Sequence, residues 1–345
     1  MYIYLTNRCN LRCKHCYMFS GNKKGNELSI NDWKKIIDNF KNAGGKSITF
    51  TGGEVLMYED WAKVIRYTKE QGFSVTILSN GTLWNQEAIN EATKYIDEIQ
   101  ISLDGISEKT NAMIRGAGNF DTAIQTAISF ANQNVKTKIT TTPTMDNIHL
   151  IKDDYVNFSK KILKRVEQKG VIHFKIAQKL LEGREVKITE SEMQEYQKIT
   201  DKIAKSLYPK YSVENFMSNL LYGAIKNCGY GGLSVSSNGE FFLCNRVLEI
   251  ESIGNIDTPF SVIINKARHF YEMTCVDNVE ECNDCELKYI CGGGCRIDEY
   301  KFAGIHTKIK VGELLRKKKK CPPSFKQSYY DKMIQSIEFI YDNEG

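Results

Sequence analysis

Two alternating patterns of apolar and polar positions occupy the first half of the chain. Short apolar runs, typical of buried strands, are separated by longer segments with helical spacing. The predicted strands cover residues 1–6, 46–51, 73–79, 98–103, 135–141 and 171–177. The first predicted helix follows Ser29, a good N-cap with Asp32 three positions on, and further helices cover 59–71, 85–95, 121–133 and 153–167. This alternation predicts a parallel sheet with right-handed crossovers, which fits either a doubly wound sheet or a partial barrel.

The pattern changes after residue 177. Helices are predicted at 189–206 and 213–226, and a hairpin is predicted where Asn238-Gly239 separates two apolar runs. Residues 275–295 are rich in cysteine and glycine and have little regular pattern, and a last helix is predicted at 325–341. A metal site can hold such an irregular segment where an apolar core cannot.

Composition narrows the classes of protein. With 345 residues, of which 41% are hydrophobic, the chain can form one large domain and an appended module. The net charge is +5 and is not gathered into one basic stripe, which argues against nucleic acid as a partner. No stretch approaches the roughly 18 apolar residues of a membrane span, and the start of the chain lacks the basic region of a secretory signal. We therefore expect a cytoplasmic protein with no membrane partner.

The cysteines are the most informative residues. There are 11 of them, an odd number in a chain without an export signal, so metal ligation is a better interpretation than disulfides. They fall into an N-terminal group and a group in the last third, with none between residues 16 and 228. The two groups are Cys9, Cys13 and Cys16, and then Cys228, Cys244, Cys275, Cys282, Cys285, Cys291, Cys295 and Cys321.

The N-terminal group has the spacing C-x3-C-x2-C directly after the first predicted strand. Three thiolates on one short loop can hold three irons of a 4Fe–4S cube, which leaves the fourth iron open for a ligand. A zinc site is the alternative. His15 would have to be its fourth ligand, and its place between Cys13 and Cys16 makes that geometry cramped.

Three polar clusters follow other predicted strands, at the strand ends where α/β folds place ligand sites. Each alone is an ordinary set of turn residues, and their common position beside the cysteine loop favours a ligand site. Glycines allow close backbone approach, Glu54 can accept from an ammonium, and Asp104 can accept from ribose hydroxyls. The candidate residues are Gly52, Gly53, Glu54, Ser79, Asn80, Ser102 and Asp104.

These motifs resemble those of the radical S-adenosylmethionine (SAM) enzymes, over about residues 1–180. The resemblance implies an α/β fold with a partial (β/α)6 barrel. It implies that Cys9, Cys13 and Cys16 bind a 4Fe–4S cluster, with His15 where an aromatic residue is usual. It also implies cofactor-binding roles: Gly52-Gly53-Glu54 for the SAM amino group, Ser102 and Asp104 for the ribose, and Arg115 for the carboxylate. The implied chemistry is reductive cleavage of SAM to a 5′-deoxyadenosyl radical that abstracts hydrogen from a substrate.

The C-terminal cysteines have the spacing C-x10-G-x4-C, then C-x2-C-x5-C-x3-C, then Cys321. This resembles the SPASM domain of the same superfamily and implies two auxiliary 4Fe–4S clusters, hence three in all. The resemblance gives the inner cluster Cys228, Cys244 and Cys295, and the outer cluster Cys282, Cys285, Cys291 and Cys321. A zinc ribbon is the alternative. Cys275 is left over and is interpreted as a fourth inner ligand, a hydrogen donor or a bystander, with ligation favoured.

The expected organisation is a radical SAM barrel at 1–180, a helical bridge at 181–226, and a SPASM domain with a C-terminal helix at 227–345. An auxiliary cluster can accept the electron that a substrate radical must lose, so the resemblance favours an oxidative peptide maturase, for example one that installs a thioether or carbon–carbon crosslink. The barrel strand begins at Met1, which either weakens the peptide interpretation or requires a separate leader-recognition protein as a partner; we also expect a reductant such as flavodoxin or ferredoxin. Alternatives are an enzyme like the anaerobic sulfatase maturases, a sugar-alcohol dehydrogenase, and a non-catalytic iron–sulfur scaffold or electron carrier.

Overall fold

The computed structural model describes residues 1–23, 25–167, 172–208, 225–228, 232–295, 297, 308–310 and 323–344. The chain divides into two compact units. The first contains residues 1–207, 234–241 and 255–260, and the second contains 208–233, 242–254 and 261–345. Cys321 and residues 213–224 of one predicted helix lie outside the described residues. The expected boundaries at 180 and 226 stay a prediction.

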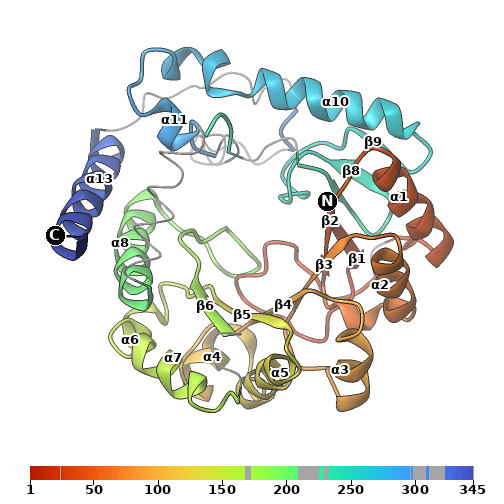
Figure 1. The fold of residues 1–345 in the computed structure, drawn as a ribbon, viewed down its shortest axis with the longest axis horizontal. Helices are drawn as coiled ribbons and strands as arrows, with labels where there is room; N and C mark the ends of the chain where they lie inside the picture. The colour runs from red at the N-terminus through yellow and green to blue at the C-terminus, as the bar shows by residue number, and fades with distance from the viewer. Residues whose placement is uncertain are drawn as a thin grey trace. The chain divides into compact units, whose positions relative to one another are not determined.

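Six parallel strands of the first unit correspond to the predicted ones, and each lies within about one residue of its predicted position. They are β1 (Tyr2–Thr6), β2 (Ser47–Gly52), β3 (Ser74–Ser79), β4 (Glu98–Ser102), β5 (Lys136–Thr141) and β6 (Ile172–Ile176). Helices α1 to α7 lie around the outside of these strands (Figure 1). These helices are α1 (Ile30–Asn42), α2 (Trp61–Glu70), α3 (Gln86–Ala92), α4 (Glu108–Arg115), α5 (Phe120–Asn132), α6 (Ile148–Ile151) and α7 (Tyr155–Leu163).

The strand order decides between the two architectures that the sequence left open. The order is β6-β5-β4-β3-β2-β1-β7-β8-β9, so β1 to β6 follow one another without reversal. Right-handed crossovers between strands that advance in one direction place every helix on the same face. The chain therefore folds as a partial (β/α)6 barrel, and a doubly wound sheet, which needs a reversal, is excluded.

Alternation along the strands gives the sheet two chemically different faces. On β4, Ile99 and Ile101 are buried, whereas the residues that alternate with them, Gln100 and Ser102, are only half-buried. The same alternation occurs on β6, where Ile172, Phe174 and Ile176 are buried and the residues between them are exposed. Apolar side chains thus pack under the helices, and the polar face is left for a ligand.

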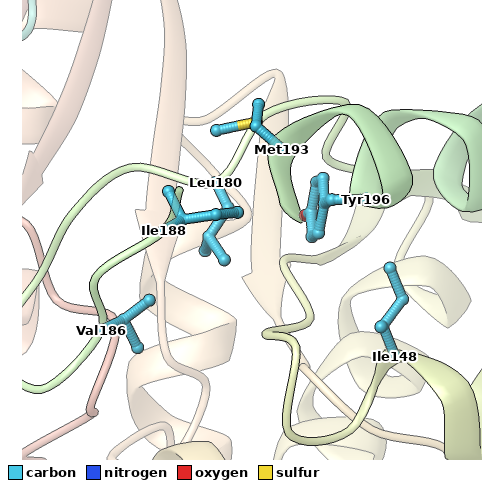
Figure 2. Packing of buried hydrophobic residues seen from close by; sticks show 6 residues of the cluster. All are labelled: Ile148, Leu180, Val186, Ile188, Met193 and Tyr196. Atoms are coloured by element: carbon cyan, nitrogen blue, oxygen red, sulfur yellow. The ribbon is translucent and has the colours of Figure 1, made fainter. Parts of the chain in front are cut away.

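A helix cap and a small apolar cluster hold the first and last helices of the first unit in place. Ser29 caps α1 as predicted, and it forms a reciprocal capping box with Asp32. Helix α8 (Glu190–Leu207) starts close to the predicted residue 189. Figure 2 shows how Met193 and Tyr196 of this helix pack with residues from the preceding segment. That buried cluster consists of Ile148, Leu180, Val186, Ile188, Met193 and Tyr196.

The remaining strands are short. The predicted hairpin is confirmed: β7 (Ser234–Val235) and β8 (Glu240–Phe242) flank Gly239, whose φ of 84° suits a residue without a side chain. β7 pairs in parallel with β1, and β9 (Gly254–Asn255) completes the sheet. The other described helices are η1 (Val55–Met57), α10 (Phe260–Met273), η2 (Val276–Asn278), η3 (Glu280–Cys282), α11 (Lys288–Cys291) and α13 (Pro323–Glu344).

Candidate active site

The loop that carries the first three cysteines is held against the glycine motif at the end of β2. The Gly53 amide donates to the Thr6 carbonyl at 2.8 Å, and the Glu54 amide donates to the Arg8 carbonyl at 2.9 Å. A Cβ at Gly52 would lie 2.3 Å from the Thr6 oxygen, and one at Gly53 would lie 2.1 Å from the Arg8 oxygen. Both glycines are therefore required for this close backbone approach, whatever else they bind.

The three thiols of this loop share one neighbourhood. Cys13 is buried, while Cys9 and Cys16 are half-buried. Burial, together with the neighbouring charges of Glu54, Cys13 and Cys16, raises the pKa of the Cys9 thiol to about 11, and a hydrogen bond from the Leu11 amide opposes the shift. A proton is therefore held tightly at Cys9 until a metal replaces it.

The thiol geometry is compatible with a cluster. No three His, Cys, Asp or Glu side chains in the described ranges converge closely enough to hold one metal ion. The ligands of a 4Fe–4S cube bind different irons, so their sulfurs need not converge on a single point. The donor set of three thiols on one loop fits such a cluster.

Glu54, Ser79 and Asn80 come together beside this loop. The Glu54 carboxylate is fully buried and accepts from the Ser79 hydroxyl at 2.7 Å and from the Asn80 amide at 2.8 Å. Burial raises the pKa of Glu54, and these two donors partly oppose the shift. The Asn80 side chain donates to Asn10 Oδ1 at 2.9 Å, which ties the end of β3 to the cysteine loop.

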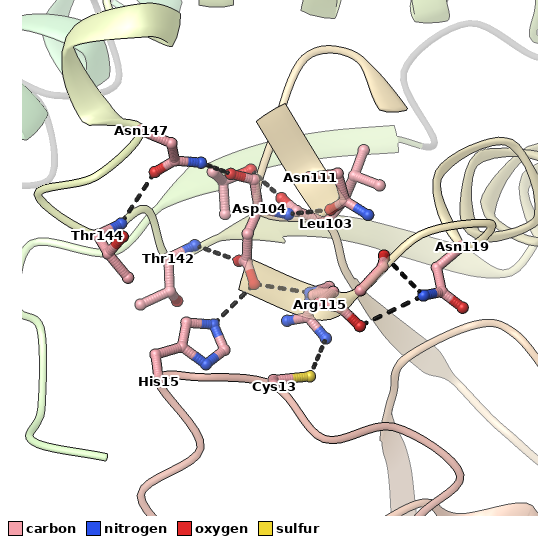
Figure 3. A network of polar contacts seen from close by, with 12 residues as sticks. Cys13, His15, Leu103, Asp104, Asn111, Arg115, Asn119, Thr142, Thr144 and Asn147 are labelled. Carbon is pink, nitrogen blue, oxygen red and sulfur yellow. Dashed lines mark hydrogen bonds and ion pairs between the residues drawn. The ribbon is translucent and has the colours of Figure 1, made fainter. Parts of the chain in front are cut away.

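A second buried carboxylate, Asp104, organises the other side of the site (Figure 3). Its Oδ2 lies 2.7 Å from His15 Nε2 and 2.6 Å from Arg115 Nε, and its Oδ1 accepts from the Thr142 amide at 2.8 Å. Burial opposes ionisation of Asp104, but the charges of Arg115 and His15 outweigh it, so the pKa of Asp104 falls to about 2. The Arg115 guanidinium also points at Cys13, with Nη1 3.9 Å from the sulfur.

Asparagine side chains hold the backbone around Asp104. Asn111 accepts from the Asp104 amide at 2.9 Å, and Asn147 donates to the Asp104 carbonyl at 2.7 Å. Ser102 is the last residue of β4, half-buried, with Thr140 as its neighbour in register. The structure thus gathers His15, Asp104 and Arg115 into one network, with Ser102 at the strand end that leads to it.

The sequence motifs did not reveal a strap at residues 183–185 that crosses the cysteine loop. Arg184 Nη1 donates to the Cys13 carbonyl at 3.0 Å, and its Nη2 donates to the Ser20 carbonyl at 2.5 Å. The Glu185 amide donates to the Lys14 carbonyl at 2.8 Å. A Cβ at Gly183 would lie 2.4 Å from the His15 carbonyl carbon. The one signal in the sequence was a glycine beside an arginine, which is too common to be informative.

In the second unit, three of the C-terminal cysteines lie near one another. Burial, together with the nearby Cys295 and Cys228, raises the pKa of the Cys244 thiol to about 11, and Arg246 opposes the shift. Arg246 Nη1 lies 3.3 Å from Cys295 Sγ. Sequence reasoning missed Arg246, since a single arginine two residues after a cysteine belongs to no recognised spacing. These three cysteines are the ones that the resemblance gives to the inner auxiliary cluster.

Three of the cysteines expected at the outer cluster lie on short helical turns. Cys282 is buried against Val276 and Val279, and the Cys285 amide donates to the Cys282 carbonyl at 3.0 Å. Cys291 ends α11, and three consecutive glycines with φ between 65° and 77° lead from it to Cys295. Such a run of left-handed residues is open only to glycine at ordinary cost.

Cys275, the cysteine outside these spacings, stands at the start of η2. Its Sγ lies 3.3 Å from the Tyr271 carbonyl oxygen, and its carbonyl accepts from the Asn278 amide at 2.9 Å. This side chain is half-buried. Whether it is a ligand, a hydrogen donor or a bystander stays a prediction.

Comparison with known proteins identifies the class. Residues 3–156 match the Radical SAM superfamily. The chain is 27% identical over 330 residues to the AdoMet-dependent heme synthase of Nitratidesulfovibrio vulgaris, which covers 88% of each protein. It is 34% identical over 143 residues to the mycofactocin maturase MftC of Mycobacterium tuberculosis, covering 39% of this chain and 36% of that one. Its fold is similar to that of anSMEcpe with bound AdoMet and a Cp18Cys peptide, with a TM-score of 0.69 at 18% identity, covering 99% and 97% of the two chains.

The chain thus contains a radical SAM domain at residues 3–156, followed by a cysteine-rich C-terminal region. Enzymes of this superfamily use SAM and a 4Fe–4S cluster. Among the residues described here, no helix has the length and apolarity needed to cross a membrane.

Proposed function

We propose that the enzyme abstracts hydrogen from a peptide and completes an oxidative modification of it. The observation that carries this proposal is the spatial grouping of Cys9, Cys13 and Cys16 with Glu54 at the carboxyl ends of the parallel strands. Cluster and SAM together supply a 5′-deoxyadenosyl radical when bound. The crosslinks that fit an oxidative reaction are thioether and carbon–carbon bonds.

The proposed roles of the polar residues follow from their positions. Glu54 is an anion whose oxygens already accept from Ser79 and Asn80, and it offers its remaining lone pairs to the methionine ammonium. Arg115 is held by Asp104 beside Cys13, where a guanidinium can pair with a carboxylate of SAM. Asp104, Ser102 and His15 would then bind on the ribose side of the cofactor.

We assign two auxiliary 4Fe–4S clusters to the C-terminal region. The proximity of Cys228, Cys244 and Cys295 supports the inner one. The turns at Cys282, Cys285 and Cys291 support the outer one, which Cys321 would complete. An auxiliary cluster next to the substrate can take the electron that the substrate radical loses, which makes the net reaction a two-electron oxidation.

Similarity to a maturase and fold similarity to a peptide-bound enzyme support a peptide as the substrate. A tetrapyrrole is the second candidate, because the similarity to a heme synthase extends over 88% of the chain. The peptide candidate would use a separate leader-recognition protein, and either would need a reductant such as flavodoxin or ferredoxin.

The test is incubation of the reconstituted enzyme with SAM and dithionite. We expect 5′-deoxyadenosine from the parent chain and none from Cys13→Ala. Adding candidate precursor peptides or an iron porphyrin should then raise 5′-deoxyadenosine formation only for the true substrate class. If the parent chain forms no 5′-deoxyadenosine, the proposed activity is wrong. If only the porphyrin stimulates it, the peptide assignment is wrong.

A further inference from the structure

A buried arginine of the second unit is aimed at a cysteine sulfur. Arg246 is 6% exposed. Its Nε donates to Glu249 Oε1 at 3.0 Å, its Nη2 pairs with Glu249 Oε2, and its Nη1 donates to Cys295 Sγ at 3.3 Å. A buried guanidinium needs partners for its charge and its donors, and here the sulfur is one of them.

Local backbone structure fixes the orientation of this arginine. The Glu249 amide donates to the Arg246 carbonyl at 3.0 Å, and this turn places the carboxylate next to the guanidinium. The backbone of Glu249 is itself held, since its carbonyl accepts from the Ile309 amide at 2.9 Å and the next residue forms a bridge with Ile309. The carboxylate thus binds one edge of the guanidinium and leaves Nη1 directed at Cys295.

The sulfur that receives this donor has two cysteine neighbours. Cys244 lies two residues before Arg246 and is close enough to Cys295 and Cys228 for their charges to act on it. These are the three cysteines proposed to bind the inner auxiliary cluster. A hydrogen bond to Cys295 would therefore be a hydrogen bond to a ligand of that cluster.

Charge near a cluster changes the energy of its reduction. Reduction adds one negative charge, so a buried cation beside a ligand sulfur stabilises the reduced form more than the oxidised form. Glu249 works in the opposite direction, but it lies on the far edge of the guanidinium from the sulfur. Because the cation is the nearer charge, the pair as a whole favours the reduced cluster.

We propose that Arg246 is a positioning residue that raises the reduction potential of the inner auxiliary cluster through Cys295, with Glu249 limiting the increase. This inference rests on the proposed function, because it needs a cluster at these cysteines. A raised potential makes the cluster a better electron acceptor, as an oxidative reaction requires.

The test is a redox titration of the full-length reconstituted enzyme followed by electron paramagnetic resonance. The variants are Arg246→Gln, which removes the charge, Arg246→Lys, which keeps it, and Glu249→Gln, which removes the opposing charge. Arg66→Gln is the control, since Arg66 pairs with Glu91 on the first unit. Iron content is measured on each preparation.

We expect Arg246→Gln to lower the midpoint potential of one cluster signal and Glu249→Gln to raise it. The potentials of the other two clusters, and all three potentials of the Arg66→Gln control, should equal those of the parent. Arg246→Lys should lie between the parent and Arg246→Gln. Unchanged potentials in both Arg246→Gln and Glu249→Gln at full iron content overturn the inference. If Arg246→Gln loses its iron, the test uses Glu249→Gln and Arg246→Lys instead. The inference is then overturned if the midpoint potentials of both variants equal that of the parent. A parent chain that binds only one cluster refutes the auxiliary-cluster assignment itself.

Discussion

Removing the Arg184 side chain should loosen the cysteine loop before any metal is bound. The guanidinium joins the carbonyls of Cys13 and Ser20, which lie on either side of Cys16 in the sequence. Arg184→Ala deletes both links and leaves two carbonyls without this donor. The strap keeps only the Glu185 amide bond to Lys14 and the Gly183 contact with His15.

The size of the effect follows from the two hydrogen bonds. A hydrogen bond to a charged group contributes about 1.5–3 kcal/mol when buried. Arg184 is half-buried, so solvent screening reduces this value, and we take about 1.5–3 kcal/mol for both bonds together. Since about 1.4 kcal/mol is a tenfold change in an equilibrium constant, the loop should open about 10- to 100-fold more often.

Amide hydrogen exchange of the metal-free chain measures this opening. The amides of Lys14, Cys16 and Phe19 donate to the carbonyls of Ile114, Cys13 and Cys16, so they report on the closed loop. We expect faster exchange in peptides that cover residues 9–21 in Arg184→Ala. Arg66→Ala, which removes an exposed arginine on α2, is the matched control.

Two further variants test how Arg184 and Gly183 hold the cysteine loop. Arg184→Lys keeps the charge but has a single terminal nitrogen, so it should give an intermediate effect because it cannot span both carbonyls as the guanidinium does. Gly183→Ala places a Cβ against the His15 backbone and should displace the strap. Exchange over residues 9–21 that is equal in Arg184→Ala and in the parent would refute the proposed role of the strap.

Four other predictions follow from the site. The anaerobic chain should hold about twelve irons, about four for each of three clusters, and stoichiometric zinc with little iron would contradict this. Cys13→Ala should abolish 5′-deoxyadenosine formation while iron analysis still shows the auxiliary clusters; unchanged product would remove Cys13 from the site. Glu54→Gln should weaken SAM binding about tenfold or more, through loss of a bond of about 1.5–3 kcal/mol, in a titration that uses the exposed Glu59→Gln as control. Cys275→Ala should lower the iron content or change one paramagnetic signal; a spectrum and iron content equal to those of the parent would rule out ligation.

The parts of the fold that were predicted are those with strong local signals. Buried strands with branched apolar residues, and the cap at Ser29, are determined by neighbouring residues in the sequence. Helix α4 was missed because two of its three buried residues, Thr110 and Asn111, are polar. Their burial is stabilised by hydrogen bonds from the Asp104 amide to the Asn111 side chain and from the Ile106 and Ser107 amides to the Thr110 hydroxyl, and periodicity cannot show these.

The residues of the candidate site were also predicted only in part. Cysteine and glycine spacings identified the residues expected to contact iron or SAM, because those contacts require particular residue types at fixed intervals. Arg184 and Arg246 were not identified, because each acts on a backbone carbonyl or a sulfur that is distant in sequence. Only the fold brings each arginine next to its partner, so a single arginine in the sequence does not predict that contact.

The position of β1 determines how the radical-forming half can be separated from the rest of the protein. Its two neighbours are β2 and β7, and β7 lies more than 180 residues later in the chain. A fragment cut at residue 180 would lose Val186, Ile188, Met193 and Tyr196, and with them the packing that anchors the strap. A fragment cut after residue 207 would keep that packing but leave one side of β1 unpaired, as a bare edge open to aggregation. Transplanting the first unit into another protein therefore requires more than one stretch of the gene.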